Sequence, residues 1–328
     1  MIEVSNLTKS FRVSTREAGF KNAVRALIKR KYEYIQALSG ISFRIADGEM
    51  VGYIGPNGAG KSTTIKIMCG ILTPDSGECE ICGRIPWKER TRHVRDIGVV
   101  FGQRSQLWWD VPVIDSFELL RDIYKVEHSA YRKTLDELTQ LLNLNRLLKT
   151  PTRNLSLGQR MRCEIAASLI HSPKVLFLDE PTIGLDAVSK IAVREFIKER
   201  NRNSGTTVIL TTHDMQDIEA LTERILLIGR GRILLDGNMR ELKQRFSRHK
   251  KIAVAYAGSL SSDMLSNCDG ITVREEKMGR ALIVLDSNLL TVSEVIEMLS
   301  KTVDIKDISV EGVTAEEMVV ELYKAYRI

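Results

Sequence analysis

The stretch GPNGAGKS, residues 55 to 62, leaves the chain few folds to choose from. It matches the motif G-x-x-x-x-G-K-[ST]. The apolar stretch EMVGYI precedes it and TTIKIMCGIL follows it, so a strand, a loop and a helix occur in the order that the motif requires. Glycines allow successive backbone N–H groups to point at phosphate oxygens, and the helix N-terminus adds its positive dipole end. The pattern predicts a nucleotide phosphate site in which Lys61 reaches the β- and γ-phosphates and Ser62 is a ligand of Mg²⁺.

An acidic strand end is expected to complete this site. The run KVLFLDEP predicts a short buried strand, Val175 to Leu178, that presents Asp179 and Glu180 at its carboxyl end. Beside a phosphate-binding loop, Asp179 is expected to hold Mg²⁺ and Glu180 to polarise the attacking water. A solvated acidic turn is the alternative.

Length and composition exclude several other classes of protein. The 328 residues suggest a large domain and a smaller one, and 43% apolar with 27% charged residues is ordinary for a globular protein. No uninterrupted apolar run approaches the roughly 18 residues of a membrane helix, so we expect a cytoplasmic chain. Five scattered cysteines fit a reducing compartment, and Cys79 and Cys82 fit a strand better than a metal site.

The net charge of +6 is concentrated in two segments. Residues 12–33 carry seven basic and two acidic side chains, and residues 239–251 carry six basic and one acidic. The remainder of the chain is net acidic, which argues against a protein that is basic throughout and binds duplex nucleic acid.

A polar stretch, NLSLGQRMR, lies about 20 residues ahead of the acidic strand. In this context it resembles the signature of the ATP-binding subunits of ABC transporters, usually LSGGQ. Leu157 departs from that signature, and the matching residues are Leu155, Ser156, Gly158 and Gln159. The resemblance implies that this segment of one subunit covers the γ-phosphate bound to the P-loop of another. It therefore implies a second ATPase subunit, expected to be a copy of this chain, and separate membrane permease subunits.

The resemblance extends over residues 2–240 and implies roles for further motifs in the family's order. In VVFGQRS, Gln103 is the expected glutamine of the glutamine loop, at the metal and the water, with Gln106 as the alternative. In PTIGLDA the matching residue is Asp186, and in VILTTHDM it is His213. That histidine would contact the γ-phosphate and help to hold Glu180 and water in line.

Nucleotide contacts are expected along the whole P-loop and at one aromatic ring. The expected P-loop contacts are Gly55, Pro56, Asn57, Gly58, Ala59, Gly60, Lys61, Ser62 and Thr63. In NLTKSF, Phe11 is expected to stack on adenine. Because the basic segment intervenes before the next strand, Tyr32 or Tyr34 is the alternative.

The expected fold is α/β, with a P-loop ABC ATPase core at 1–240 that carries a helical insertion at about 104–157 and a basic insertion at about 12–33. A basic linker at 241–251 would lead to a small C-terminal α+β domain of ferredoxin-like type at 252–328. Periodicity predicts core helices at 61–71, 115–143, 158–171, 186–203 and 214–222. The C-terminal domain would contact its twin, bind a regulator or cap the core.

Two segments are candidates for contact with the membrane partner. Trp108, Trp109 and Pro112 stand at the entrance of the helical insertion, where either core packing or a partner contact is expected. The basic insertion has apolar residues at helical spacing, which predicts a short amphipathic helix near anionic headgroups or an acidic permease surface; a solvated insertion is the alternative. These apolar residues are Phe20, Val24, Leu27 and Ile28.

These observations predict the ATPase subunit of an ABC transporter, with ATP and Mg²⁺ as cofactors, lying on the cytoplasmic face of the membrane. The sequences of its motifs resemble those of the ATPases of ABC-2-type exporters. An importer ATPase with a regulatory C-terminal domain is one alternative, and a soluble ABC ATPase acting on ribosomes or DNA is another. The second lacks support because the chain has neither two cassettes nor a cassette split by coiled coils, so no nucleic acid partner is expected.

Overall fold

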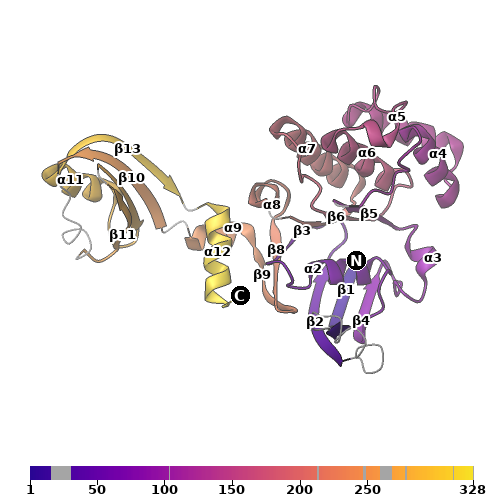
Figure 1. The fold of residues 1–328 in the computed structure, drawn as a ribbon, viewed down its shortest axis with the longest axis horizontal. Helices are drawn as coiled ribbons and strands as arrows, with labels where there is room; N and C mark the ends of the chain where they lie inside the picture. Colours follow the sequence, from indigo (N-terminus) through magenta and orange to yellow (C-terminus); the bar gives the residue numbers. More distant parts are fainter. Residues whose placement is uncertain are drawn as a thin grey trace, which may run out of the picture. The chain divides into compact units, whose positions relative to one another are not determined.

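The computed structural model describes residues 1–15, 31–102, 104–212, 214–246, 249–258, 268–277, 279–312 and 314–327. Its fold is mixed α/β and divides into two units, Met1–Gly237 and Asn238–Arg327 (Figure 1). Each unit has a hydrophobic core of its own. None of the helices that the structure describes is both long enough and apolar enough to cross a bilayer.

A six-stranded sheet carries the first unit, in the order β5-β6-β7-β3-β8-β9. β5, β6, β7, β3 and β8 pair in parallel, and their runs of buried apolar residues are typical of strands covered on both faces. The bounds are β3 Met50–Ile54, β5 Ile97–Phe101, β6 Val175–Asp179, β7 Thr207–Thr211, β8 Arg224–Gly229 and β9 Arg232–Asn238.

An antiparallel sheet, β2-β1-β4, packs with helix α2 (Lys61–Met68) over the central sheet. Its strands are β1 Ile2–Thr15, β2 Lys31–Ile45 and β4 Ser76–Ile81. Cys79 lies buried in β4 as a free thiol, and Cys82 follows the strand. The basic insertion begins and ends in strand, because Thr15 pairs with Lys31. Its expected helical face lies outside the described residues.

Helices cover the other side of the central sheet: Figure 1 shows α5, α6 and α7 across β5 and β6 from α2. The bounds are α3 Arg90–His93, α4 Val113–Tyr124, α5 His128–Leu141, the 3-10 turn η1 Thr152–Asn154, α6 Leu157–Leu169, α7 Ala187–Ser204 and α8 Met215–Leu221. The single helix expected at 115–143 is wrong. Lys125 ends α4 in the left-handed region at φ 56°, and the Glu127 side chain caps α5 by accepting from Ser129 N and Ala130 N.

The second unit contains a four-stranded antiparallel sheet, ordered β11-β12-β10-β13. Residues 241–251, expected to be a linker, instead carry most of α9 and the start of β10, because Met239 and Leu242 are buried at helical spacing. The ferredoxin-like assignment stays a prediction. The bounds are α9 Met239–Phe246, β10 His249–Ala257, β11 Ile271–Lys277, β12 Arg280–Asp286, α11 Val292–Thr302, β13 Asp304–Gly312 and α12 Ala315–Ala325.

Candidate active site

The P-loop joins β3 to α2 through a backbone that only glycine accommodates. Gly58 and Gly60 adopt φ of 80° and 114°, in the region that side chains disfavour. A Cβ on Gly55 would lie 2.2 Å from Ile228 O, so the neighbouring strand leaves no room for one. The loop therefore turns tightly enough to present backbone N–H groups at the start of α2, where an anion is favoured.

Lys61 lies inside the curve of this loop. Its Nζ donates to Gly55 O at 2.5 Å and to Pro56 O at 3.0 Å. Burial lowers the pKa of Lys61, while the nearby charges of Glu180 and Asp179 act in the opposite direction. The ammonium is thus already partly desolvated and lies between the loop and two carboxylates, where a phosphate would meet it.

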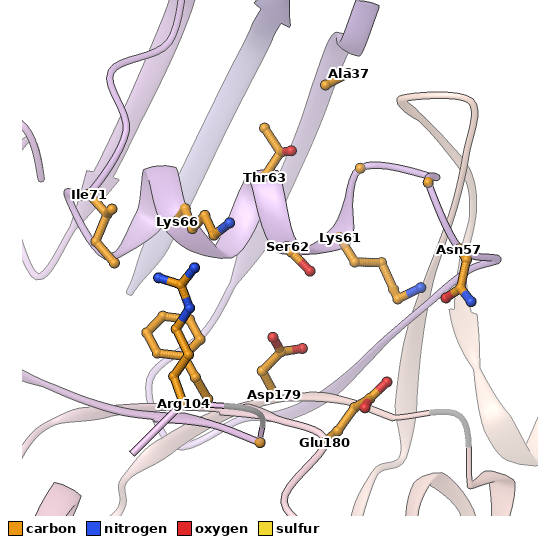
Figure 2. Close-up of a pocket in the computed structure, with 14 residues that line it drawn as sticks. Ala37, Asn57, Lys61, Ser62, Thr63, Lys66, Ile71, Arg104, Asp179 and Glu180 are labelled. Atoms are coloured by element: carbon orange, nitrogen blue, oxygen red, sulfur yellow. The ribbon is translucent and has the colours of Figure 1, made fainter. Parts of the chain in front are cut away.

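Asp179 and Glu180 emerge at the end of β6, as predicted, and point toward Ser62 and Lys61 (Figure 2). The Thr211 hydroxyl donates to Asp179 Oδ1, and Glu180 N donates to Thr211 O at 2.8 Å, so β7 holds both residues. Glu180 has φ 55°, an uncommon value for a residue with a side chain. Such strain is maintained by surrounding structure and occurs often at functional sites.

A pocket of about 460 Å³ lies between the P-loop and the end of β6 (Figure 2). Six of its lining residues were not singled out from the sequence: Ala37, Lys66, Ile71, Phe101, Gly102 and Arg104. Helical periodicity could have indicated Lys66, which lies one turn after Ser62 on α2. Arg104 stands next to the expected glutamine, but nothing in its sequence context predicts that it lines the pocket.

The expected glutamine and histidine, Gln103 and His213, lie outside the described residues. Beside the first, Gly102 N donates to Asp179 O at 2.8 Å, and a Cβ on Gly102 would come within 2.9 Å of the carbonyl oxygens of Asp179 and Glu180. The glutamine segment therefore starts in contact with the acidic strand end. Gln106, the alternative glutamine, donates its amide to Glu164 O at 3.0 Å and so faces α6.

The signature residues begin helix α6 and do not line the pocket of their own chain, among the residues described. Ser156 is the N-cap and forms a capping box with Gln159. Leu157 packs against Gly184, and a Cβ on Gly158 would lie 3.3 Å from Leu185 Cδ2. The start of α6 thus packs on the loop that leads to Asp186.

Asp186 caps the next helix, α7, and does not line the pocket either. Its carboxylate accepts from Ser189 N at 2.8 Å and Ser189 Oγ at 3.0 Å, and these hydrogen bonds lower its pKa. The predicted site residues therefore fall into two groups on each chain. The P-loop, Asp179 and Glu180 converge, whereas the signature and Asp186 form a separate exposed edge.

The aromatic candidates for adenine lie on β1 and β2. Phe11 pairs with Ile35 and has Lys9 Nζ 5.9 Å from its ring centroid. Tyr32 stacks under the Arg12 guanidinium at 3.4 Å, and Tyr34 is 71% exposed. None of these three lines the described part of the pocket, where β2 contributes Ala37 instead.

The donor set fits a hard divalent cation bound with nucleotide. Ser62 supplies a hydroxyl and Asp179 a carboxylate from opposite walls of the pocket (Figure 2), and Mg²⁺ prefers such oxygen ligands together with substrate phosphates. The parts of the chain that the structure describes contain no cluster of three or more His, Cys, Asp or Glu residues that would hold a metal by itself.

Comparison with known proteins agrees with this geometry. The ABC transporter family model matches residues 38–183. The chain is 32% identical to the linearmycin resistance ATP-binding protein LnrL of Bacillus subtilis, covering 76% of this chain and 81% of LnrL. It is 30% identical to the daunorubicin resistance ATP-binding protein DrrA3 of Streptomyces coeruleorubidus, covering 90% and 93%.

Solved structures give the same result. A dimer of the ATP-binding cassette MJ0796 in a post-hydrolysis state, bound to ADP and Pi, is similar with a TM-score of 0.61 and 27% identity, covering 73% of this chain and 99% of that one. The P-loop and acidic strand end thus occur in a cassette fold seen with hydrolysis products. The chain belongs to the ATP-binding subunits of ABC transporters, and it is an ATPase.

Proposed function

We propose that this ATPase powers export through separate membrane subunits of the ABC-2 type, on the cytoplasmic face of the membrane, as a homodimer that closes on ATP. The single observation that carries the two-chain site is the separation of its residues. Lys61, Asp179 and Glu180 line one pocket, whereas Ser156 and Gln159 sit on an exposed helix end outside it. A second chain would bring that helix end to the pocket.

The proposed roles rest on the positions of the described residues and, for Gln103 and His213, on the sequence motifs that contain them. Backbone N–H groups of the P-loop and Lys61 bind the phosphates, and Ser62 and Asp179 hold Mg²⁺, which would neutralise charge on the transferred phosphoryl group. Glu180 orients the attacking water and accepts its proton, with Gln103 and His213 assigned to the same water and γ-phosphate. Ser156, Gly158 and Gln159 of the second chain would close the site, with Asp186 beside them at the dimer contact.

The variant Glu180→Gln tests this proposal. It keeps the size of the side chain and removes the base, so we expect hydrolysis to fall by about two to four orders of magnitude while an ATP-bound dimer accumulates. Light scattering after size-exclusion chromatography, with ATP and Mg²⁺, measures the dimer. Hydrolysis at the wild-type rate would exclude the role of Glu180, and a monomer at saturating ATP would exclude the two-chain site.

Export is proposed because the relatives named above are resistance ATP-binding proteins and because the motif sequences resemble those of ATPases that serve ABC-2-type exporters. Purification of the tagged chain from membranes, followed by mass spectrometry of the co-purified proteins and small molecules, tests it. Permease subunits without an extracytoplasmic binding protein support an exporter. Recovery of such a binding protein in stoichiometric amount would indicate an importer.

Three further proposals concern parts outside this site. Phe11 stacks on adenine. The second unit has a ferredoxin-like fold, which its strand order and α11 support, and it contributes to dimer contacts. The basic insertion docks near the membrane. Replacing Lys29, Arg30 and Lys31 with Glu while leaving co-purification with the permease unchanged would contradict the last of these.

A further inference from the structure

Helix α6 carries a buried acid that the hydrolysis site does not use. Glu164 is only 4% exposed and lies more than two turns after Ser156, on the same helix. The Ser105 hydroxyl donates to Glu164 Oε1, and Gln106 N donates to Oε2 at 3.1 Å. Gln106 Nε2 also donates to the backbone oxygen of Glu164 at 3.0 Å. Every one of these donors belongs to the short segment that follows the expected glutamine.

A carboxylate in this position has to be satisfied by that segment. Burial raises the pKa of Glu164, and the hydrogen bonds from Ser105 and Gln106 counteract the rise. A buried acceptor that loses its donors is strongly destabilised, so Glu164 favours the single arrangement in which Ser105–Leu107 lies against α6. An alanine would pack in the helix without imposing any position on the segment.

Three further contacts join the same segment to α6 and to the residues just before it. The Arg160 guanidinium lies 5.6 Å from the Trp109 ring centroid. Arg153 N donates to Trp109 O at 3.0 Å, and Arg153 Nη1 pairs with Asp110 at 2.9 Å. These contacts are solvated and so contribute less than the buried one. Residues 105–110 and α6 thus form one body, with Glu164 at its buried centre.

The other end of this segment is part of the nucleotide pocket. Gly102 and Arg104 line it, and Figure 2 shows the Arg104 side chain reaching across toward α2. Gly102 N is bonded to Asp179 O. A short covalent path therefore runs from the phosphate side of the pocket to Ser105 and Gln106, and Glu164 continues it onto α6.

We propose that Glu164 is a positioning residue that locks Ser105–Leu107 onto α6, so that nucleotide bound in one chain's pocket sets the position of that chain's own signature. This inference rests on the proposed two-chain site, in which that signature serves the second chain's ATP. Glu164 then couples the two ATP sites without touching either nucleotide. Its loss leaves the P-loop intact but uncouples the signature from the pocket.

Two substitutions of Glu164 separate position from charge. In Glu164→Gln, the amide oxygen accepts from Gln106 N and the amide nitrogen donates to Ser105 Oγ, so the lock is kept. In Glu164→Leu, a side chain of similar size fills the helix position and offers no acceptor. Ser168→Ala is the matched control, because that buried hydroxyl on α6 donates to Ile165 O of its own helix and not to residues 105–107.

The experiment measures steady-state ATP hydrolysis by the full chain over a range of ATP concentrations, together with binding of a fluorescent ATP analogue. We expect Glu164→Leu to lower kcat about tenfold and to bring the Hill coefficient to 1, with the affinity for the analogue within about twofold of wild type. Glu164→Gln and Ser168→Ala should keep the wild-type kcat and Hill coefficient. Ser105→Ala should give part of the effect, and adding it to Glu164→Leu should give no more.

Wild-type kcat and cooperativity in Glu164→Leu would overturn the inference. So would equal loss in Glu164→Gln and Glu164→Leu, since the lock survives only in the first. Circular dichroism shows whether each variant is folded; if Glu164→Leu does not fold, Ser105→Ala decides, and cooperativity unchanged there overturns the inference too. The proposed two-chain site fails separately, if Glu180→Gln remains a monomer at saturating ATP.

Discussion

Leu157 packs directly against Gly184, so that a Cβ built on Gly184 would lie 2.2 Å from Leu157 Cδ2. Gly184 also adopts φ 68°, which side chains disfavour. Gly184→Ala should therefore combine backbone strain with a clash, lowering the free energy of unfolding by about 2 kcal/mol and slowing ATP hydrolysis several-fold. Chemical denaturation and steady-state ATPase assays measure the two effects.

Gly205→Ala is the matched control for that substitution. Gly205 has a similar φ of 62°, but nothing lies within 4 Å of the added Cβ. It should lose about 1 kcal/mol from strain alone and keep full activity. Adding Leu157→Ala to Gly184→Ala should restore activity and the part of stability due to the clash. If the double variant is as slow as Gly184→Ala, the contact with Leu157 is not the cause.

Thr211→Val tests how β7 orients the metal-binding carboxylate. The substitution is nearly isosteric and removes the hydroxyl that donates to Asp179. Hydrogen bonds to charged groups contribute roughly 1.5–3 kcal/mol, so kcat should fall about tenfold or more and half-maximal activity should need more Mg²⁺. Titration of Mg²⁺ at saturating ATP measures both.

Thr222→Val provides the comparison, because the Thr222 hydroxyl is also buried but donates to Ile218 O of its own helix. It should leave the magnesium requirement unchanged. An unchanged magnesium requirement in Thr211→Val would show that Asp179 needs no support from β7.

The backbone of Glu180 predicts an unusual order of stabilities. At φ 55° a glycine is unstrained, whereas an alanine is strained. The free energy of unfolding of Glu180→Gly should therefore exceed that of Glu180→Ala by about 1 kcal/mol, although both variants are inactive. In an ordinary helix or strand, glycine would be the less stable of the two. Urea denaturation compares them, and a more stable alanine variant would show that the left-handed backbone is not strained here.

His171 predicts an acid-sensitive stability. It is stacked on Tyr124 with ring centroids 3.9 Å apart and bonds to Ile97 O at 2.8 Å, and burial lowers its pKa. Because the pKa of His171 is lower in the folded chain, the unfolded chain takes up a proton on this group at a higher pH than the folded chain does. The free energy of unfolding should therefore fall as pH drops below about 6.5.

His171→Phe keeps the stack and removes the titration. It should lose about 1 kcal/mol at pH 8 with the hydrogen bond, and show a shallower loss of stability between pH 6.5 and 5 than wild type. Buried His93, whose pKa burial also lowers, accounts for part of the remaining slope. Tyr124→Phe, which leaves the imidazole in place, should keep the wild-type slope. Equal slopes in wild type and His171→Phe would contradict this assignment.

The sequence predicted the P-loop and the acidic strand end because each requires a local pattern. The glycines at 58 and 60 fix a backbone, and a fully apolar strand fixes where Asp179 emerges. The break between α4 and α5 was missed because apolar periodicity continues across Lys125 and Glu127, and only their backbone angles interrupt the helix. Glu164 was missed because a single acidic residue in a helix is normally expected to face solvent. Its partners Gln106 and Ser105 are 58 and 59 residues away in the sequence, and only the fold brings them together.

Ser156 and Gln159 close the start of α6 with lone pairs alone. Ser156 Oγ accepts from Gln159 N at 3.2 Å, and Gln159 Oε1 accepts from Ser156 N at 3.0 Å. The hydroxyl hydrogen of Ser156 and the amide hydrogens of Gln159 are not used in this cap. The capping hydrogen bonds therefore leave these donors available to an incoming anion. The helix start is therefore ordered by its own residues, without a contribution from a ligand.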